Sequence, residues 1–138
     1  GYAGHGETYM SEDNVLWWSH GGLLHGESHK RFKFLHDILC ETPGLGLRYA
    51  GGGDEVRAVP QETWAYMKPV QDYYLIYYSF MGPSFRIYHF DDTTRFHLYV
   101  LDTWNMTRED RGIVWGRFKV ELPGRPYMAI QLKKVKEV

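Results

Sequence analysis

Hydrophobic and polar positions follow two different periods along the chain, and the change of period separates a helical part from a strand-rich part. The helical part carries an apolar stripe spaced as one face of a helix, and the stripe consists of Phe32, Leu35, Ile38 and Leu39. Ser28 is a suitable N-cap, and Pro43 stops the helix because proline disfavours helical geometry in the residue before it. The pattern therefore predicts one amphipathic helix over residues 28–41.

From about Tyr49 onward, short stretches of alternating apolar and polar residues are separated by turn residues. The inward sets of the three clearest stretches are Phe96, Leu98 and Val100, then Phe118, Val120 and Leu122, then Met128, Ile130 and Leu132. Residues 73–80 are apolar or aromatic on both faces, which is typical of a central strand between two packed layers. Residues 85–90 supply a further strand. The sequence thus predicts a mainly β fold, an antiparallel β-sandwich of about five to seven short strands preceded by one α-helix.

The connecting segments carry expectations of their own. The glycines at 51–53 form either a flexible link or a tight loop. Residues 102–112 read as a longer loop held by Asp102, in which Trp104 either covers the sandwich edge or meets a ligand. Arg86 is expected to form an internal ion pair. The charged tail, residues 133–138, is expected to fray.

A chain of 138 residues is long enough for one domain and a further piece. The first part is rich in Gly, His and Trp, and we place the boundary between residues 1–48 and residues 49–138. The single cysteine, Cys40, excludes an internal disulfide, and its place in the helical pattern predicts a buried thiol. The Gly-rich opening has no starting Met and reads like the loop after a strand, so we expect the natural protein to extend upstream.

Charge and hydropathy narrow the classes of partner. Lys and Arg total 16 against 17 for Asp and Glu, and no basic stripe is present, so nucleic acid is not an expected partner. No apolar run is long enough to span a bilayer and no signal peptide is recognisable, so no membrane partner is expected and the localisation stays open. Aromatic residues make up 17% of the chain, which is typical of packed sheets or of surfaces that stack on sugars.

Side chains that could carry chemistry gather near the start of the chain, namely His5, Glu7, His20, His25, Glu27 and His29. Neither a metal nor another cofactor is expected, because the cluster lacks an HExxH helix and paired cysteines. Glu7 and Glu27 would suit a glycosidase if their carboxyls lay about 5–10 Å apart, whereas Glu27 equally suits the start of a helix. Trp17 and Trp18 are adjacent and leave two alternatives. Either at least one indole lines a cleft and stacks on a sugar, or both indoles pack inside the protein.

Six segments together resemble a known family, and they are residues 22–28, 34–35, 73–75, 83–86, 102–107 and 122–130. They resemble the C-terminal part of bacterial apiosidase-like glycoside hydrolases, in which a barrel catalytic domain precedes a small β domain of uncharacterised function. The resemblance implies that residues 1–48 are a remnant of a (β/α)8 barrel, with residues 28–41 as its closing helix. Residues 49–138 would then be the appended β-sandwich.

The resemblance also implies a role for the chain. The catalytic carboxylates of similar enzymes lie on earlier barrel strands, so no residue here is assigned as catalytic. The residues expected to contact sugar, in one wall of the parent's active site, are His5, Glu7, Trp17 and Trp18. We expect an accessory and stabilising domain of a carbohydrate-active glycoside hydrolase, not catalytic by itself. Its expected partners are an upstream catalytic barrel and, through the parent enzyme, an oligosaccharide or polysaccharide.

Two other functions remain open from the sequence. The first is an independent carbohydrate-binding module that uses exposed Trp and Tyr side chains. The second is a small complete enzyme that uses Glu7 and Glu27 as its carboxylate pair.

Overall fold

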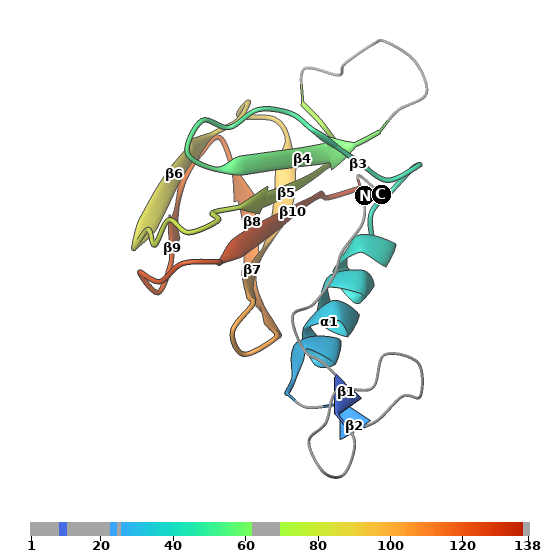
Figure 1. Cartoon of the computed structure of the whole chain (residues 1–138). Helices are drawn as coiled ribbons and strands as arrows, with labels where there is room; N and C mark the ends of the chain where they lie inside the picture. Colours follow the sequence, from blue (N-terminus) through green and yellow to red (C-terminus); the bar gives the residue numbers. More distant parts are fainter. Residues whose placement is uncertain (1–8, 11–22, 25, 62–69, 137–138) are drawn as a thin grey trace. The chain divides into compact units, whose positions relative to one another are not determined.

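The computed structural model describes residues 9–10, 23–24, 26–61 and 70–136. The chain divides into two compact units, Gly1–Cys40 and Glu41–Val138. Within the described part of the first unit, β1 (Tyr9–Met10) pairs antiparallel with β2 (Leu23–Leu24), and α1 (Ser28–Cys40) follows (Figure 1). No helix in the described ranges is long and apolar enough to cross a membrane.

Helix α1 confirms the helix predicted from the apolar stripe. Its first turn is closed by the Glu27 carbonyl, which accepts hydrogen bonds from the amides of Lys30 at 3.0 Å and Arg31 at 3.4 Å. Ile38 is buried, whereas Leu35 and Leu39 are each 43% exposed. The stripe is therefore only partly covered.

The prediction of a buried Cys40 thiol is wrong, because Cys40 is exposed. Its sulfur lies 3.5 Å from Nε2 of His36, one helical turn earlier. Residues four apart share a helix face, so Cys40 lies on the polar face with His36 and not on the apolar stripe.

The second unit is a two-layered β structure. Its strands are β3 (Leu47–Tyr49), β4 (Val56–Pro60), β5 (Tyr73–Tyr77), β6 (Phe85–His89), β7 (Arg95–Asp102), β8 (Thr107–Trp115), β9 (Arg117–Glu121) and β10 (Ala129–Lys134). One sheet has the order β3-β4-β5-β10-β7-β8, and the other pairs β6 with β9 (Figure 1). All described pairings are antiparallel. The predicted mainly β sandwich with a single helix is confirmed, and β5 is the expected central strand.

Two segments are more regular than the sequence pattern indicated. Strand β8 occupies the region expected to be a loop, and β10 extends to Lys134, inside the tail expected to fray. Strand β8 lies at the edge of its sheet and most of its side chains are exposed on both faces. An edge strand of this kind carries no alternation of apolar and polar residues, which is why the pattern missed it.

The two sheets are joined where β6 continues into β7 and β8 continues into β9. At this bend, the Phe90 amide donates to the Gly116 carbonyl at 2.9 Å. Gly116 has φ +54, and a Cβ there would lie 2.5 Å from Oδ1 of Asp92. Between β6 and β7 the same bend is held by Asp91, whose carboxylate accepts the amides of Thr93 and Thr94 at 2.9 and 2.6 Å. The strands thereby pass from one sheet to the other.

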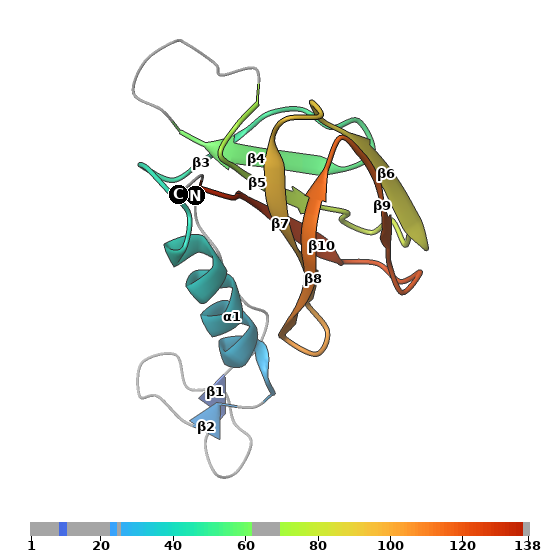
Figure 2. The ribbon, with the colours of Figure 1, turned by 180° about the vertical axis from the view of Figure 1, so that it is seen from behind.

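Figure 2 shows the two sheets from behind, and the core lies between them. It joins residues of the small sheet to the inward rows of the large one, and its members are Val59, Tyr74, Ile76, Tyr78, Tyr88, Phe96, Leu98, Val100, Val120, Leu122, Met128, Ile130 and Leu132. The three inward sets predicted from alternation are confirmed, with Phe118 partly buried against this core.

The start of the β unit is fixed to the large sheet by Glu41. Its carboxylate accepts hydrogen bonds from Arg108 on β8 and Lys133 on β10, each at 2.5 Å. The hydrogen bond from Lys133, helped by Arg108, lowers the pKa of Glu41 below its ordinary value. Both cations also lie over the ring of Tyr99 on β7, at 5.0 and 5.4 Å from its centroid.

Candidate functional site

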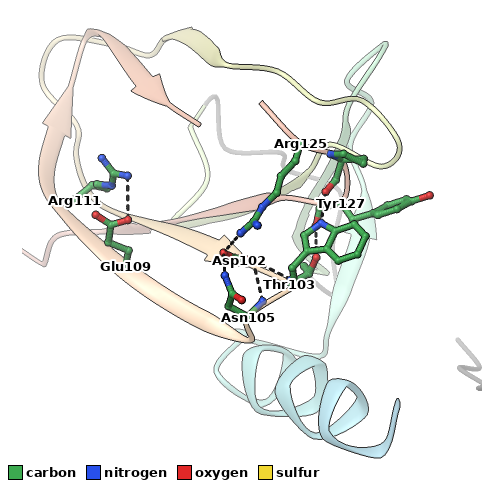
Figure 3. A network of polar contacts seen from close by, with 9 residues as sticks. Asp102, Thr103, Asn105, Glu109, Arg111, Arg125 and Tyr127 are labelled. Atoms are coloured by element: carbon green, nitrogen blue, oxygen red, sulfur yellow. Dashed lines mark hydrogen bonds and ion pairs between the residues drawn. The ribbon is translucent and has the colours of Figure 1, made fainter. Parts of the chain in front are cut away.

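The described residues of the β unit offer two polar networks and two surface depressions as candidates. The first network is a corner around Asp102, at the end of β7 (Figure 3). Asp102 Oδ1 accepts the amides of Trp104 at 2.9 Å and Asn105 at 3.1 Å, and Oδ2 accepts the Asn105 side-chain amide and the Arg125 guanidinium. Burial raises the pKa of Asp102, but these hydrogen bonds and the charge of Arg125 outweigh burial and hold it below its ordinary value.

The corner is closed by two contacts to the segment before β10. Thr103 donates its hydroxyl to the Tyr127 carbonyl at 2.5 Å, and the indole Nε1 of Trp104 donates to the Pro126 carbonyl at 2.8 Å. The rings of Trp104 and Tyr127 lie 5.9 Å apart. Both keep substantial exposure, 45% for Trp104 and 43% for Tyr127. The polar side chains of this turn are thus bonded within the protein, while the aromatic pair Trp104 and Tyr127 remains partly exposed to solvent.

Three non-glycine residues with positive φ, which side chains disfavour, lie near this corner. They are Ser79 at φ 51, Met106 at φ 54 and Tyr127 at φ 64. The Tyr127 amide donates to the Ser79 carbonyl at 2.6 Å, so the loops after β5 and before β10 are bonded together. Left-handed backbone costs roughly 1 kcal/mol per residue, and the surrounding hydrogen bonds offset that cost.

The second network surrounds Glu55, which is 5% exposed. Its Oε1 accepts Nε of Arg57 at 2.8 Å, and its Oε2 accepts the hydroxyl of Tyr88 at 2.9 Å. The Tyr88 hydroxyl also lies 2.9 Å from the hydroxyl of Tyr78. Burial is the main reason that the pKa values of Tyr78 and Tyr88 are raised above 10.0, and the neighbouring carboxylate adds to the effect. Both tyrosines therefore stay protonated hydrogen-bond donors.

Arg86 confirms the expected internal ion pair. Its terminal nitrogen donates to Oδ2 of Asp54 at 2.7 Å, and its Nε lies 3.8 Å from Oε2 of Glu55. The glycine loop before Asp54 is tight, because a Cβ on Gly52 would lie 2.2 Å from the Glu55 carbonyl oxygen. The glycines at 51–53 are therefore a tight loop that closes over Glu55 and Arg57, and not a flexible link.

A cleft of about 510 Å³ opens beside this network and is lined by Arg57, Tyr74, His89, Phe90, Asp91 and Asp92, among others. Its volume falls in the range of roughly 300–1,000 Å³ that is typical of small-molecule sites. A larger depression of about 1100 Å³ is lined by Pro43, Asp72, Thr94, Arg95, Lys134 and Lys136, among others.

The residues proposed from the sequence to contact sugar, His5, Glu7, Trp17 and Trp18, lie outside the described residues, as do His20 and His25. Glu27 is described, is exposed and pairs with Lys30 at 2.8 Å. Whether Glu7 and Glu27 form a pair thus stays a prediction. In the described part of the chain, no three His, Cys, Asp or Glu side chains are grouped as a metal site.

The Glu55 network was missed from the sequence. Glu55 follows a run of glycines and precedes an ordinary strand, so nothing in its sequence context distinguishes a buried glutamate from an exposed one. The alternation of Glu55, just before β4, with Arg57 and Val59 on β4 was the available signal, but the same pattern is equally typical of a solvated face.

A family model and a solved structure each match the chain. Residues 62–133 match the family model described as "Domain of unknown function (DUF5605)". The structure is similar to the crystal structure of a putative glycoside hydrolase from Bacteroides vulgatus ATCC 8482, with a TM-score of 0.69 and 23% sequence identity. The match covers 93% of this chain and 28% of that one. No curated protein matches the chain.

Proposed function

Because the chain belongs to the family described as Domain of unknown function (DUF5605), and because its fold recurs as one part of a longer chain, we propose an accessory role. The chain is a stabilising domain of a carbohydrate-active glycoside hydrolase and is not catalytic by itself. The observation that carries this proposal is the coverage of the structural match, 93% of this chain against 28% of a chain described as a putative glycoside hydrolase.

Among the described residues, the two carboxylates at the centre of the polar networks are bonded within the protein, which supports a role without catalysis. Two-carboxylate glycoside hydrolysis requires an acid and a base or nucleophile on either side of the scissile bond. Glu55 is enclosed by Arg57 and Tyr88, and Asp102 is held by Arg125 and the amides of its own turn. Both carboxylates are thus bonded inside the protein and are not presented to a substrate.

The finer part of the proposal follows the family resemblance. The parent enzyme is apiosidase-like, this chain is its C-terminal part, and residues 1–48 are the last loop and helix of the catalytic barrel. In that placement, His5, Glu7, Trp17 and Trp18 contribute to one wall of the sugar site. The catalytic carboxylates belong to upstream strands of the barrel.

A direct test compares the parent with a version that lacks residues 49–138. The accessory role predicts a lower midpoint of thermal unfolding and a faster loss of glycosidase activity on heating, with little change in the initial rate. The isolated chain should release no product from aryl glycosides or plant oligosaccharides. Turnover by the isolated chain that disappears in Glu7→Gln would overturn the proposal, because Glu7 would then act without the barrel.

The exposed Trp104 and Tyr127 favour one alternative function, an independent carbohydrate-binding module. Aromatic rings at a surface offer apolar faces on which sugar rings stack. The alternative predicts that a polysaccharide shifts the tryptophan fluorescence of the isolated chain and that Trp104→Ala abolishes the shift. A shift that persists in Trp104→Ala would exclude this corner as the binding surface.

A further inference from the structure

The cleft beside the Glu55 network combines an apolar floor with polar walls. Tyr74 and Phe90 line it, with ring centroids 5.1 Å apart, and Phe90 packs in turn on Phe96 and Phe118. Tyr74 and Phe96 belong to the core, and Phe90 and Phe118 pack against it, so close packing restrains the floor. A small number of polar groups around such a floor is the usual composition of a small-molecule site.

Arg57 supplies a positioned donor on one wall. Its Nε is bonded to the buried Glu55, its guanidinium carbon lies 5.6 Å from the centroid of the Tyr88 ring, and its side chain is 39% exposed. Glu55 binds Nε of Arg57, and within the described residues the two terminal nitrogens donate no hydrogen bond. A guanidinium held through its Nε in this way loses little side-chain entropy when a ligand binds.

Other lining residues supply acceptors. Asp92 and His89 line the cleft at the bend between the sheets, where Asp92 Oδ1 occupies the space that a Cβ on Gly116 would fill. Asp91 also lines the cleft, but its carboxylate is committed to the amides of Thr93 and Thr94. The ring nitrogens of His89 donate or accept according to the tautomer.

The charges decide which ligand the cleft suits. Arg57 is compensated by Glu55, and the remaining formal charges are the two aspartates, so an anionic ligand would meet repulsion. A neutral polyol with apolar C–H faces matches each feature, because its hydroxyls can donate to Asp92 and accept from Arg57 while a ring face covers Phe90.

We propose that this cleft is a binding subsite for a neutral oligosaccharide. Its lining residues differ from those of the Trp104 and Tyr127 corner. The choice of sugar as ligand class rests on the proposed function, whereas the location and the preference for a neutral ligand rest on the cleft.

The test is a titration of the isotope-labelled chain with neutral and with uronic-acid oligosaccharides of equal length, followed by nuclear magnetic resonance. Neutral oligosaccharides are expected to shift the signals of Tyr74, His89, Phe90 and the Arg57 side chain. His89→Ala and Asp92→Asn should each weaken binding about tenfold, the effect of one lost hydrogen bond to a polar or charged group. Arg57→Gln should weaken it at least as much.

Matched variants separate the site from general damage. Arg111→Gln removes a half-exposed arginine on β8 that pairs with Glu109, and His36→Ala removes an exposed histidine on α1, and neither should change the affinity. His89 is exposed, so His89→Ala is expected to fold even if Arg57→Gln does not.

Three outcomes would overturn the proposal. Shifts confined to Trp104 and Tyr127 would move sugar binding to the corner. Preference for uronic-acid oligosaccharides would contradict the charge argument. Binding of no saccharide at millimolar concentration would remove the subsite, and the accessory role would stand or fall separately, on the deletion test in the parent enzyme.

Discussion

The Asp102 corner and the Glu55 network are built alike but lie in different surroundings. In each, one carboxylate holds an arginine: Arg125 at the corner and Arg57 in the network. Asp102 is half-buried and fixes a turn, whereas Glu55 is 5% exposed and its neighbours Tyr78 and Tyr88 are almost fully buried. Removing the partner of a solvent-accessible carboxylate costs little free energy, because water replaces the lost bond. A buried carboxylate that loses its partner is left unsolvated, and the cost is larger. The same bond should therefore matter more in the network than at the corner.

We expect the largest loss of stability from Glu55→Ala. This change leaves Arg57 and the hydroxyl of Tyr88 without their acceptor, and we expect the free energy of unfolding to fall by about 4 kcal/mol. Urea denaturation followed by circular dichroism measures the change. A loss below about 1 kcal/mol would mean that water reaches Glu55 and that the network is not a buried one.

A second way to break the network is to open the loop that covers it. Gly52→Ala would place a Cβ 2.2 Å from the Glu55 carbonyl oxygen, at a φ of +141, and we expect a loss of about 3 kcal/mol. Gly53→Ala is the matched control, because it meets no atom within 4 Å and has only an unfavourable φ of +67. We expect it to cost about 1 kcal/mol. Equal losses in the two variants would show that the loop is not packed on Glu55.

At the corner, Asp102→Ala should cost about 2 kcal/mol, because it removes several hydrogen bonds at once but leaves its former partners within reach of water. Glu109→Ala, which removes an exposed pair with Arg111 at 3.0 Å, should cost less than about 0.5 kcal/mol. Thermal unfolding of Asp102→Ala, Glu109→Ala and Glu55→Ala compares the three losses. If Asp102→Ala proves as costly as Glu55→Ala, burial is not what distinguishes the two sites.

Tyr78→Phe tests a single hydrogen bond within the Glu55 network. Tyr78→Phe removes one buried hydroxyl that bonds Tyr88, and we expect a loss of about 1 kcal/mol near neutral pH. Burial raises the pKa of Tyr78 above 10.0 in the folded state, so the stabilisation is complete below pH 10 and is lost as the pH rises above it. Stability of the wild type should therefore fall above pH 10 and fall less in Tyr78→Phe. Denaturation at a series of alkaline pH values, compared with Tyr49→Phe at an exposed tyrosine, measures the difference.

The sequence determined the elements whose residues follow a clear period. Helix α1 and strands β7, β9 and β10 were predicted because one of their faces is apolar and the other is not. It also determined the turn at Asp102, since Asp and Asn bond their own backbone in any fold. Strand β8 and the position of Cys40 were mispredicted, because an edge strand and the polar face of a short helix leave no such pattern.

Only the tertiary structure decided what the polar residues do. Glu55 precedes β4, Arg57 lies on β4, Tyr78 follows β5 and Tyr88 lies on β6. Only the folding of two sheets onto each other brings their side chains within hydrogen-bonding distance. The cleft beside them has the same origin, since its floor and walls come from β4, β5 and the bend between the sheets. Burial is a property of the whole packed arrangement, and local sequence therefore cannot distinguish a glutamate that faces water from one enclosed between two sheets.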